Sequence, residues 1–106
     1  MAAGPLLRMQ VRRDGATAVL RLAGEADVAT ASRLEVRLND VVRDRAVRRV
    51  VVEASELGFL DLAGLDVLLR SADELRRRGG ELVLRAPTRR VQRLLQVLSA
   101  PLPVED

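Results

Sequence analysis

The fold is decided by the stretch VVVEASELGFLDLAGL, residues 50–65. Its opening valines, with Val47 leading into them, are typical of a central strand covered on both faces. A short connection through Ser55 and Gly58 reaches Asp61, whose carboxylate can cap the helix that follows. The apolar residues of that helix share one face: Leu65, Leu68, Leu69, Ala72 and Leu75. The stretch therefore predicts a buried strand that leads into an amphipathic helix.

A hairpin is expected upstream of this stretch. Residues 7–12 alternate apolar and polar side chains, as a half-buried strand does, and residues 17–23 are expected to form a second strand. The Asp-Gly pair between them favours a tight turn, so we expect these strands to be antiparallel. Gly24 is expected to end the second strand.

Capping residues delimit two helices. Residues 30–42 place apolar side chains three and four positions apart, which predicts a helix. Either Asp27 or Thr30 can cap its amide end. The helix after Asp61 closes with the arginines 76–78, and the glycines 79–80 favour a left-handed exit.

The last third of the chain repeats the alternation of strand and helix. Residues 81–86 are predicted to form a strand, and Pro87 and Thr88 start a third helix. Four of its residues are expected to face inward: Val91, Leu94, Leu95 and Leu98. Two prolines then stop regular structure, so residues 101–106 are predicted to be a loose tail.

The predicted order is strand, strand, helix, strand, helix, strand, helix. Strands separated by helices imply parallel crossovers, so the expected fold is α/β with a mixed sheet of four to five strands. The length of 106 residues suits one domain over residues 1–106, with its core in about residues 7–98.

The composition excludes most kinds of catalysis. The chain has neither cysteine nor histidine. Thiolate nucleophiles, imidazole catalysis and the usual zinc sites are therefore ruled out. Carboxylates are the remaining acid and base groups and show no evident paired arrangement, so we expect no enzyme, metal or cofactor. The chain also has no lysine, which argues against a phosphoacceptor receiver domain or a P-loop.

The charge does not by itself indicate nucleic-acid binding. All 18 basic residues are arginine and the net charge is only +3, which favours codon bias over a designed surface. The single aromatic residue, Phe59, offers no platform for stacking bases. A basic surface remains an alternative, with affinity that falls with salt. It would use Arg85, Arg89, Arg90 and Arg93, for which a solvated helix face is the simpler interpretation.

The first residues point to the cytoplasm. Residues 1–8 contain too short an apolar stretch for a signal peptide, and the chain has no cysteine for a disulfide. We therefore expect a cytoplasmic protein without direct membrane insertion.

Three segments together resemble a known family. Residues 50–65 resemble the signature of the STAS domain of bacterial anti-sigma-factor antagonists, in which a hydrophobic strand leads to Asp-Ser-Ser-Gly-Leu or a close variant. Residues 24–31, GEADVATA, resemble a second pattern of the same family, Gly-Glu-Leu-Asp with a Thr-Ala pair after it. Residues 79–84, GGELVL, fit a third family pattern. The resemblance covers about residues 8–98.

The resemblance implies a partner-binding domain. Such antagonists sequester an anti-sigma factor, often a serine-kinase-like ATPase, and thereby release a sigma factor. Phosphorylation of the second motif serine breaks the complex. This chain departs from the family there, because Leu62 and Ala63 stand at the two serine positions and have no hydroxyl. Phosphorylation at the family site is therefore not expected.

Three uses of such a domain stay open. The chain could be a constitutive antagonist, a permanently docked subunit, or a partner-binding domain regulated elsewhere. Ser55 and Ser71 are the nearest hydroxyls for the last use. A docked subunit would resemble the STAS subunit of the phospholipid-transport complex, which binds an ABC ATPase and has alanine at the position of Ala63 but usually threonine at that of Leu62.

The expected binding surface combines two of the three segments. Asp61 would fix the start of the helix, and neighbouring side chains would face or border the partner. The proposed set is Glu25, Asp27, Thr30, Asp61, Leu62, Ala63, Gly64 and Asp66. An exposed apolar side chain in a first helical turn, as Leu62 would be, is more useful to a binding patch than to a solvated surface.

Overall fold

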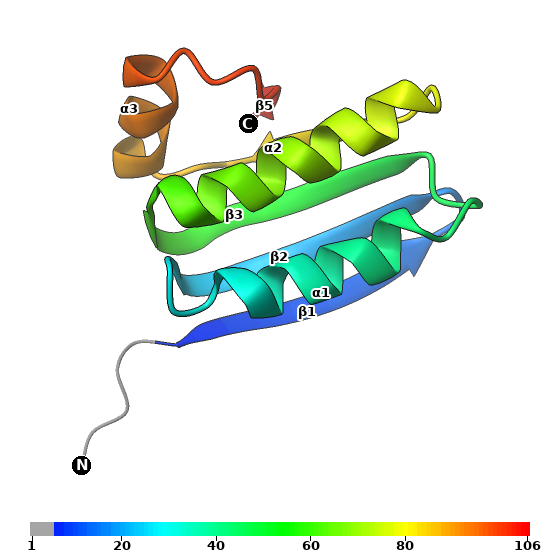
Figure 1. Cartoon of the computed structure of the whole chain (residues 1–106), viewed down its shortest axis with the longest axis horizontal. Coiled ribbons are helices and arrows are strands. Elements are labelled where there is room, and N and C mark those ends of the chain that lie inside the picture. Colours follow the sequence, from blue (N-terminus) through cyan, green and yellow to red (C-terminus); the bar gives the residue numbers. More distant parts are fainter. Residues whose placement is uncertain (1–5) are drawn as a thin grey trace.

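The chain folds into one mixed sheet with helices on one face (Figure 1). The computed structural model describes residues 6–106, so most of the N-terminal stretch discussed above lies outside the described residues. Within that range the strands are β1 (Leu7–Asp14), β2 (Thr17–Ala26), β3 (Arg49–Leu60), β4 (Glu81–Arg85) and β5 (Val104–Glu105). The helices are α1 (Ala31–Val42), α2 (Leu62–Arg77) and α3 (Arg89–Val97).

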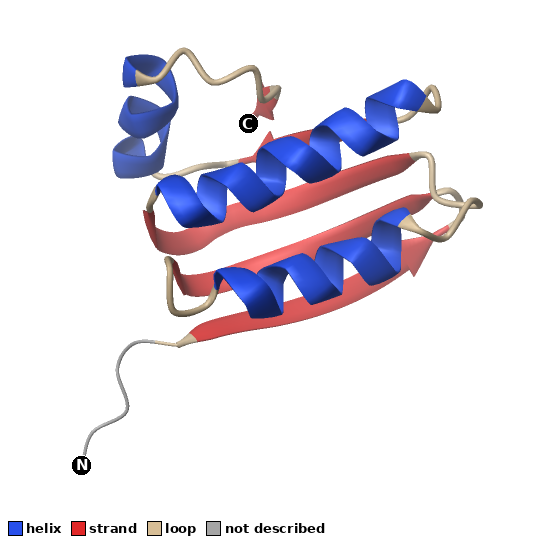
Figure 2. Ribbon diagram, in the orientation of Figure 1, coloured by secondary structure: helices blue, strands red, loops and turns tan. Residues whose placement is uncertain are grey.

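The strands lie side by side in the order β1-β2-β3-β4-β5. The β1–β2 pair is antiparallel and the other three pairs are parallel. Helices α1 and α2 run side by side across one face of the sheet (Figure 2), and α3 lies at the end where α2 begins. The prediction of an α/β fold with a mixed sheet is confirmed.

The central strand is β3, as the run of valines predicts. Val50 and Val52 face the helices and belong to the main core. Val51 points to the opposite face, where it is fully buried between Val19 of β2 and Val83 of β4. The valines of β3 are therefore buried on both faces, as predicted, although helices α1 and α2 lie across one face only. A row of valines across neighbouring strands keeps the other face apolar at its centre.

Strands β2 and β3 are longer than expected. Gly24 does not end β2, which continues to Ala26 after a shift of register at Gly24. The segment expected to connect Asp61 to the valines is the second half of β3, with Leu57 and Leu60 buried. Each extension exists because it pairs with the other, which places the ends of the two strands together.

The expected helix ends are present. Asp61 accepts a hydrogen bond from the Gly64 amide, and Gly79 has a φ of 83° at the exit of α2. The amide of Gly80 returns to the carbonyl of Leu75 over 2.8 Å, which satisfies an otherwise free helix carbonyl. In α3, Leu98 is 43% exposed rather than inward, because the helix ends at Val97 and Leu98 is its cap residue.

The C-terminal segment is ordered, and the prediction of a loose tail is wrong. Strand β5 pairs in parallel with β4, and Leu102 is buried just before it. Glu105 binds two arginines, with its carboxylate 2.8 Å from Arg85 and 2.7 Å from Arg49. Backbone hydrogen bonds to the edge of β4 and these ion pairs hold the segment in place. The spacing of apolar residues in the sequence indicates neither kind of interaction, so the strand was not predicted.

The ion pairs make this segment sensitive to acid. The hydrogen bond from Arg85, assisted by the charge of Arg49, lowers the pKa of Glu105. A lowered pKa means that the stabilisation is present above the pKa of the unfolded chain and is lost as the pH falls through the folded value. We expect Glu105→Gln to lower a few-fold, at neutral pH, the hydrogen-exchange protection of the Leu84 and Ala86 amides, which bond to the segment.

The matched control for this experiment is Glu81→Gln. Glu81 also binds Arg49, over 2.9 Å, but lies on β4 itself and so does not anchor the tail. Equal protection in Glu105→Gln and the unmodified chain at neutral pH would contradict the prediction.

Candidate functional site

The structure brings two of the sequence motifs together at one end of the sheet. Because β2 and β3 are parallel, their carboxyl ends lie at the same edge. The Asp61 amide donates to the Ala26 carbonyl over 3.1 Å, so the start of α2 rests against the end of β2. The loop from β2 to α1 and the first turn of α2 therefore form one continuous surface.

Asp61 joins the two segments through its side chain. Its Oδ1 accepts from the Gly64 amide at 3.1 Å, which is the predicted helix cap. Its Oδ2 accepts from the Val28 amide at 3.2 Å, across 33 positions of sequence. One carboxylate thus both starts α2 and fixes the loop before α1.

The loop from β2 to α1 is held by its own polar side chains. Asp27 Oδ1 accepts from the amides of Ala29 and Thr30, at 3.0 and 3.1 Å. The buried Thr30 hydroxyl donates to the Glu25 carbonyl at 2.9 Å and accepts from the Asp27 amide at 3.0 Å. Thr30 occupies the cap position of α1, but the side chain of neither Thr30 nor Asp27 accepts from an amide of the first helical turn; the Ala31 amide donates instead to the Asp27 backbone carbonyl, over 2.8 Å. These residues shape the loop rather than cap the helix.

The motif residues of α2 divide into exposed and buried positions. Leu62 is 64% exposed, Ala63 is partly exposed and Asp66 is exposed. Gly64 is buried, and a Cβ there would lie 2.5 Å from the Ala26 carbonyl oxygen. Leu62, Ala63 and Asp66 can therefore touch another molecule, whereas Gly64 sets how closely α2 approaches β2.

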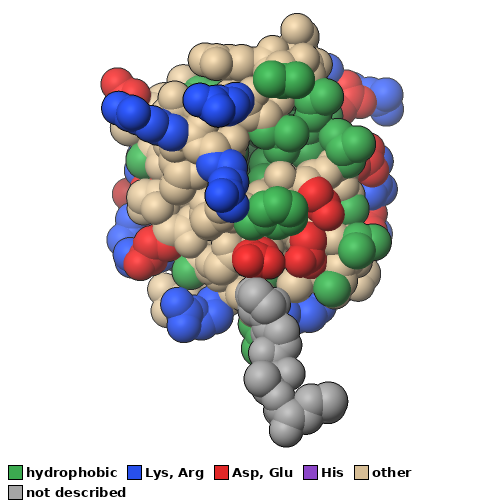
Figure 3. All heavy atoms as spheres, turned by 90° about the vertical axis from the view of Figure 1, so that its left-hand side faces the viewer, with side chains coloured by type: hydrophobic (Ala, Val, Ile, Leu, Met, Phe, Trp, Pro, Cys, Tyr) green, Lys and Arg blue, Asp and Glu red, His purple; other side chains and the backbone are tan. Residues whose placement is uncertain are grey.

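An apolar residue that was not predicted extends this surface. Val28 is 80% exposed in the loop before α1, next to the Asp61 carboxylate that its amide contacts. Figure 3 views this end of the molecule and shows hydrophobic side chains next to a group of acidic ones. The sequence offered one signal for this residue, a valine between polar residues of a loop. That signal alone does not distinguish an exposed valine from a valine that enters the core.

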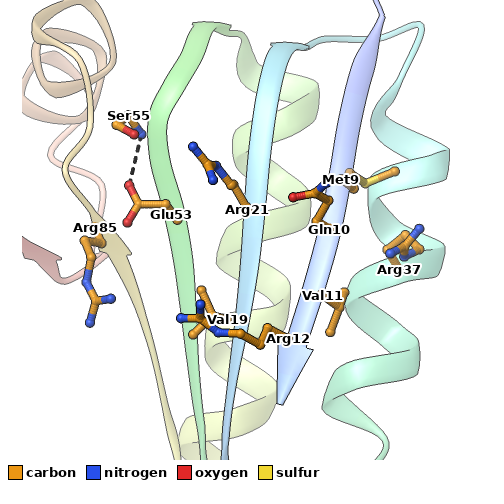
Figure 4. A pocket seen from close by; sticks show the side chains of 10 residues that line it. All are labelled: Met9, Gln10, Val11, Arg12, Val19, Arg21, Arg37, Glu53, Ser55 and Arg85. Carbon is orange, nitrogen blue, oxygen red and sulfur yellow. Dashed lines mark hydrogen bonds between the residues drawn. The ribbon is translucent and has the colours of Figure 1, made fainter. Parts of the chain in front are cut away.

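A cavity lies elsewhere, mainly on the face of the sheet opposite α1 and α2. It is an open hollow of about 850 Å³ over β1, β2 and β3. Figure 4 shows Arg21, Glu53 and Ser55 on this face, with Arg85 beside them on β4. Its polar side chains come from strands β1 to β4 and from Arg37 of α1, and none of them belongs to the surface around Asp61.

The two candidate serines for modification and the candidate basic surface differ in how exposed they are. Ser55 is exposed on the helix-free face, and its amide donates to Glu53 Oε1 at 3.4 Å. Ser71 is only 6% exposed on α2, so a modifying enzyme would reach it only after the helix opened. Of the four arginines considered as a basic surface, Arg85 is ion-paired with Glu105, which leaves the three on α3 exposed.

Across residues 6–106, no cluster of three acidic side chains is arranged to hold a metal ion. No helix in this described range combines the length and the apolar character needed to cross a membrane.

The model of the STAS domain family matches residues 8–101, which include both motif segments that meet at Asp61. This chain belongs to the STAS domain family. The strand order, the position of α2 after β3 and the loop before α1 are therefore features of a STAS domain.

Several similar proteins are named anti-sigma factor antagonists. An anti-sigma F factor antagonist of Paenibacillus polymyxa is 26% identical over 91 residues, which cover 86% of this chain and 78% of the relative. An anti-sigma factor antagonist structure from Mycobacterium paratuberculosis is 27% identical, covers 99% of this chain and 90% of its own, and has a TM-score of 0.77. Bacillus SpoIIAA in its unphosphorylated form has a TM-score of 0.81 at 23% identity, over 93% and 88% of the two chains, and supports the fold.

The double role of Asp61 can be tested by mutation. Asp61→Ala removes the cap and the bond to Val28 together, so we expect the free energy of unfolding to fall by about 1–2 kcal/mol. Amide chemical shifts of residues 27–30 should move as the loop loses its anchor. Asp66→Ala, on the exposed side of the same helix, is the control and should change stability by about 0.5 kcal/mol or less. An equal loss in the two variants would contradict the assigned role.

Proposed function

We propose that this STAS domain is an anti-sigma-factor antagonist that lacks the phosphorylation switch of its family. It would bind an anti-sigma factor of the serine-kinase-like ATPase class in the cytoplasm and so release a sigma factor. The observation that carries the proposal is Ala63 at the exposed start of α2, on the surface that the two family motifs share.

The chemistry of Ala63 supports an interaction without that switch. A methyl group has no oxygen to accept a phosphoryl group, so no phosphate can form at this position. A phosphate would bring a charge of about −1.5 to −2 to the interface, which repels acidic neighbours and is costly to desolvate. With alanine, the surface keeps its unphosphorylated charge under all conditions.

The surroundings of Ala63 support a protein partner. The exposed Leu62 and Val28 supply apolar area on either side of Asp61. Exposed apolar side chains that are rimmed by polar groups are typical of protein interaction sites. The proposed interface therefore includes Leu62, Ala63 and Asp66, with Glu25, Asp27 and Asp61 at its border and with Thr30 and Gly64 supporting it from below.

The test introduces the missing charge. We expect Ala63→Glu to weaken the affinity for the partner at least tenfold, which corresponds to about 1.4 kcal/mol, while the fold is unchanged. The tagged chain would be used for co-purification from its native cells, partners identified by mass spectrometry, and the recovered partner titrated by calorimetry. Ala16→Glu, an equal change at an exposed turn between β1 and β2, is the matched control.

The outcomes separate the possible uses of the domain. Recovery of an anti-sigma factor that binds the control variant but not Ala63→Glu is the expected result. Recovery of an ABC ATPase instead would overturn the proposal in favour of a transporter subunit. Unchanged affinity in Ala63→Glu would move the interface away from the start of α2.

A further inference from the structure

An apolar groove continues the proposed interface towards α3. It lies between the first half of α2 and the segment that follows α3, and its volume is about 410 Å³. Its apolar lining consists of Leu62, Leu65, Leu69, Leu98, Ala100 and Pro101, and Asp66 is its acidic member. Because Leu62 also borders Asp61, the groove and the motif surface are continuous.

The groove stays open because of how α3 ends. The helix stops at Val97, and Ser99 turns the chain with a φ of 49°. After Leu98 the small Ala100 packs partly buried against the core and Leu102 is the next fully buried residue, so residues 99–101 leave a groove beside α2. Leu98 and Leu62 thus remain 43% and 64% exposed on opposite sides of one groove. Two exposed leucines across a groove fit an inserted apolar side chain.

The charge is negative on the side of the groove formed by α2 and the adjoining loop, whereas the exposed arginines of α3 do not line the groove. Within the described residues, Glu25, Asp27 and Asp61 form no ion pair, and all three lie in or next to the loop that adjoins α2. Asp66 and Glu35 share the single guanidinium of Arg70, at 2.9 and 2.7 Å, so this group also carries an excess negative charge. In Figure 3 a group of acidic side chains directly adjoins the hydrophobic ones, and arginine side chains border them on another side.

We infer that the groove receives one large apolar side chain from the anti-sigma factor, on a segment that carries lysine or arginine next to it. This inference rests on the proposed function and adds a second contact, between α2 and α3, to the contact around Ala63. The apolar lining selects a leucine- or phenylalanine-sized side chain, and the unpaired carboxylates beside it select a basic neighbour. An acidic segment would be repelled.

The test places a photo-crosslinking residue in the groove. p-Benzoylphenylalanine would be introduced at position 98 or, separately, at position 62 of the full chain, with position 36 on α1 as the control. Val36 is an exposed apolar residue that does not line the groove. We expect positions 98 and 62 to crosslink to the same anti-sigma factor, and peptide mapping from position 98 to identify a segment with a large apolar residue beside lysine or arginine.

Affinity provides a second measurement. Leu98→Asp should weaken binding to the purified partner at least tenfold, whereas Val36→Asp should leave it unchanged, with both melting curves recorded to verify the fold.

Each outcome decides a different point. Crosslinking from position 62 but not from 98 would overturn the groove and leave the proposed function standing. Crosslinking from position 98 to a basic, apolar segment of some other protein would support the groove and overturn the proposed function. A mapped segment that is acidic, or no crosslink from either position, would overturn the inference.

Discussion

Gly24→Ala is expected to lower the free energy of unfolding by about 3 kcal/mol or more. Gly24 has a φ of 113°, a conformation that residues with a side chain rarely adopt. A Cβ at this position would also lie 2.0 Å from the Leu6 carbonyl oxygen, where the start of β1 passes β2. Backbone strain and overlap with a backbone atom add, and neither can be relieved by turning a side chain.

A loss of this size is a large part of the stability of a small domain, about 5–15 kcal/mol. Urea denaturation followed by circular dichroism would measure it. Gly58→Ala is the matched control, because Gly58 is in the neighbouring β3 and its Cβ would meet only the Gly24 carbonyl oxygen at 3.8 Å. Equal midpoints for Gly24→Ala and the unmodified chain would show that the backbone at the register shift of β2 adapts to the added methyl group, contrary to the prediction.

Gly64→Ala is expected to destabilise the chain by about 2 kcal/mol, although alanine is the better helix former. The gain in helix propensity is about 1 kcal/mol. Against it, the new Cβ would lie 2.5 Å from the Ala26 carbonyl oxygen and 2.9 Å from both the Ala26 Cβ and the Leu60 Cδ1. Overpacking of this kind costs about 1–3 kcal/mol and more when backbone must move. The start of α2 would shift away from β2.

The same variant separates packing from binding. Because the Asp61 amide bonds to Ala26, a shift of α2 moves Leu62 and Ala63 relative to the loop before α1. Gly64→Ala should therefore weaken partner binding even at temperatures where it is fully folded. A variant more stable than the unmodified chain, as helix propensity alone predicts, would contradict the close approach described for this pair of elements.

Local patterns predicted the elements whose signals lie in adjacent residues. The Asp-Gly turn, the valines of β3 and the capping aspartate of α2 each combine a periodicity with a start or stop signal, and all are present in the structure. The added lengths of β2 and β3 were missed because they depend on mutual pairing. Strand β5 was missed for a similar reason, since Arg49 and Arg85 become partners of Glu105 only in the folded chain.

The position of the candidate site was predictable from the sequence, but which of its residues are exposed and which are buried was not. The motifs placed Asp61, Leu62 and Ala63 at the start of a helix, which the structure confirms. They could not show that Thr30 and Gly64 are buried. The spacing of residues in a motif is the same whether a residue touches a partner or holds the local backbone in place. The bond from Val28 to Asp61 likewise required the three-dimensional pairing of β2 with β3.

The spatial order of the strands, which matches their order in the sequence, has a consequence for biosynthesis. Every strand joins the one translated immediately before it, so no part of the sheet must wait for a distant segment to be made. Folds whose contacts are closer in sequence generally fold faster, and a growing chain can add its strands in turn as it leaves the ribosome. The hairpin of β1 and β2 would be the first template, and the arrival of β5 against β4 would complete the sheet.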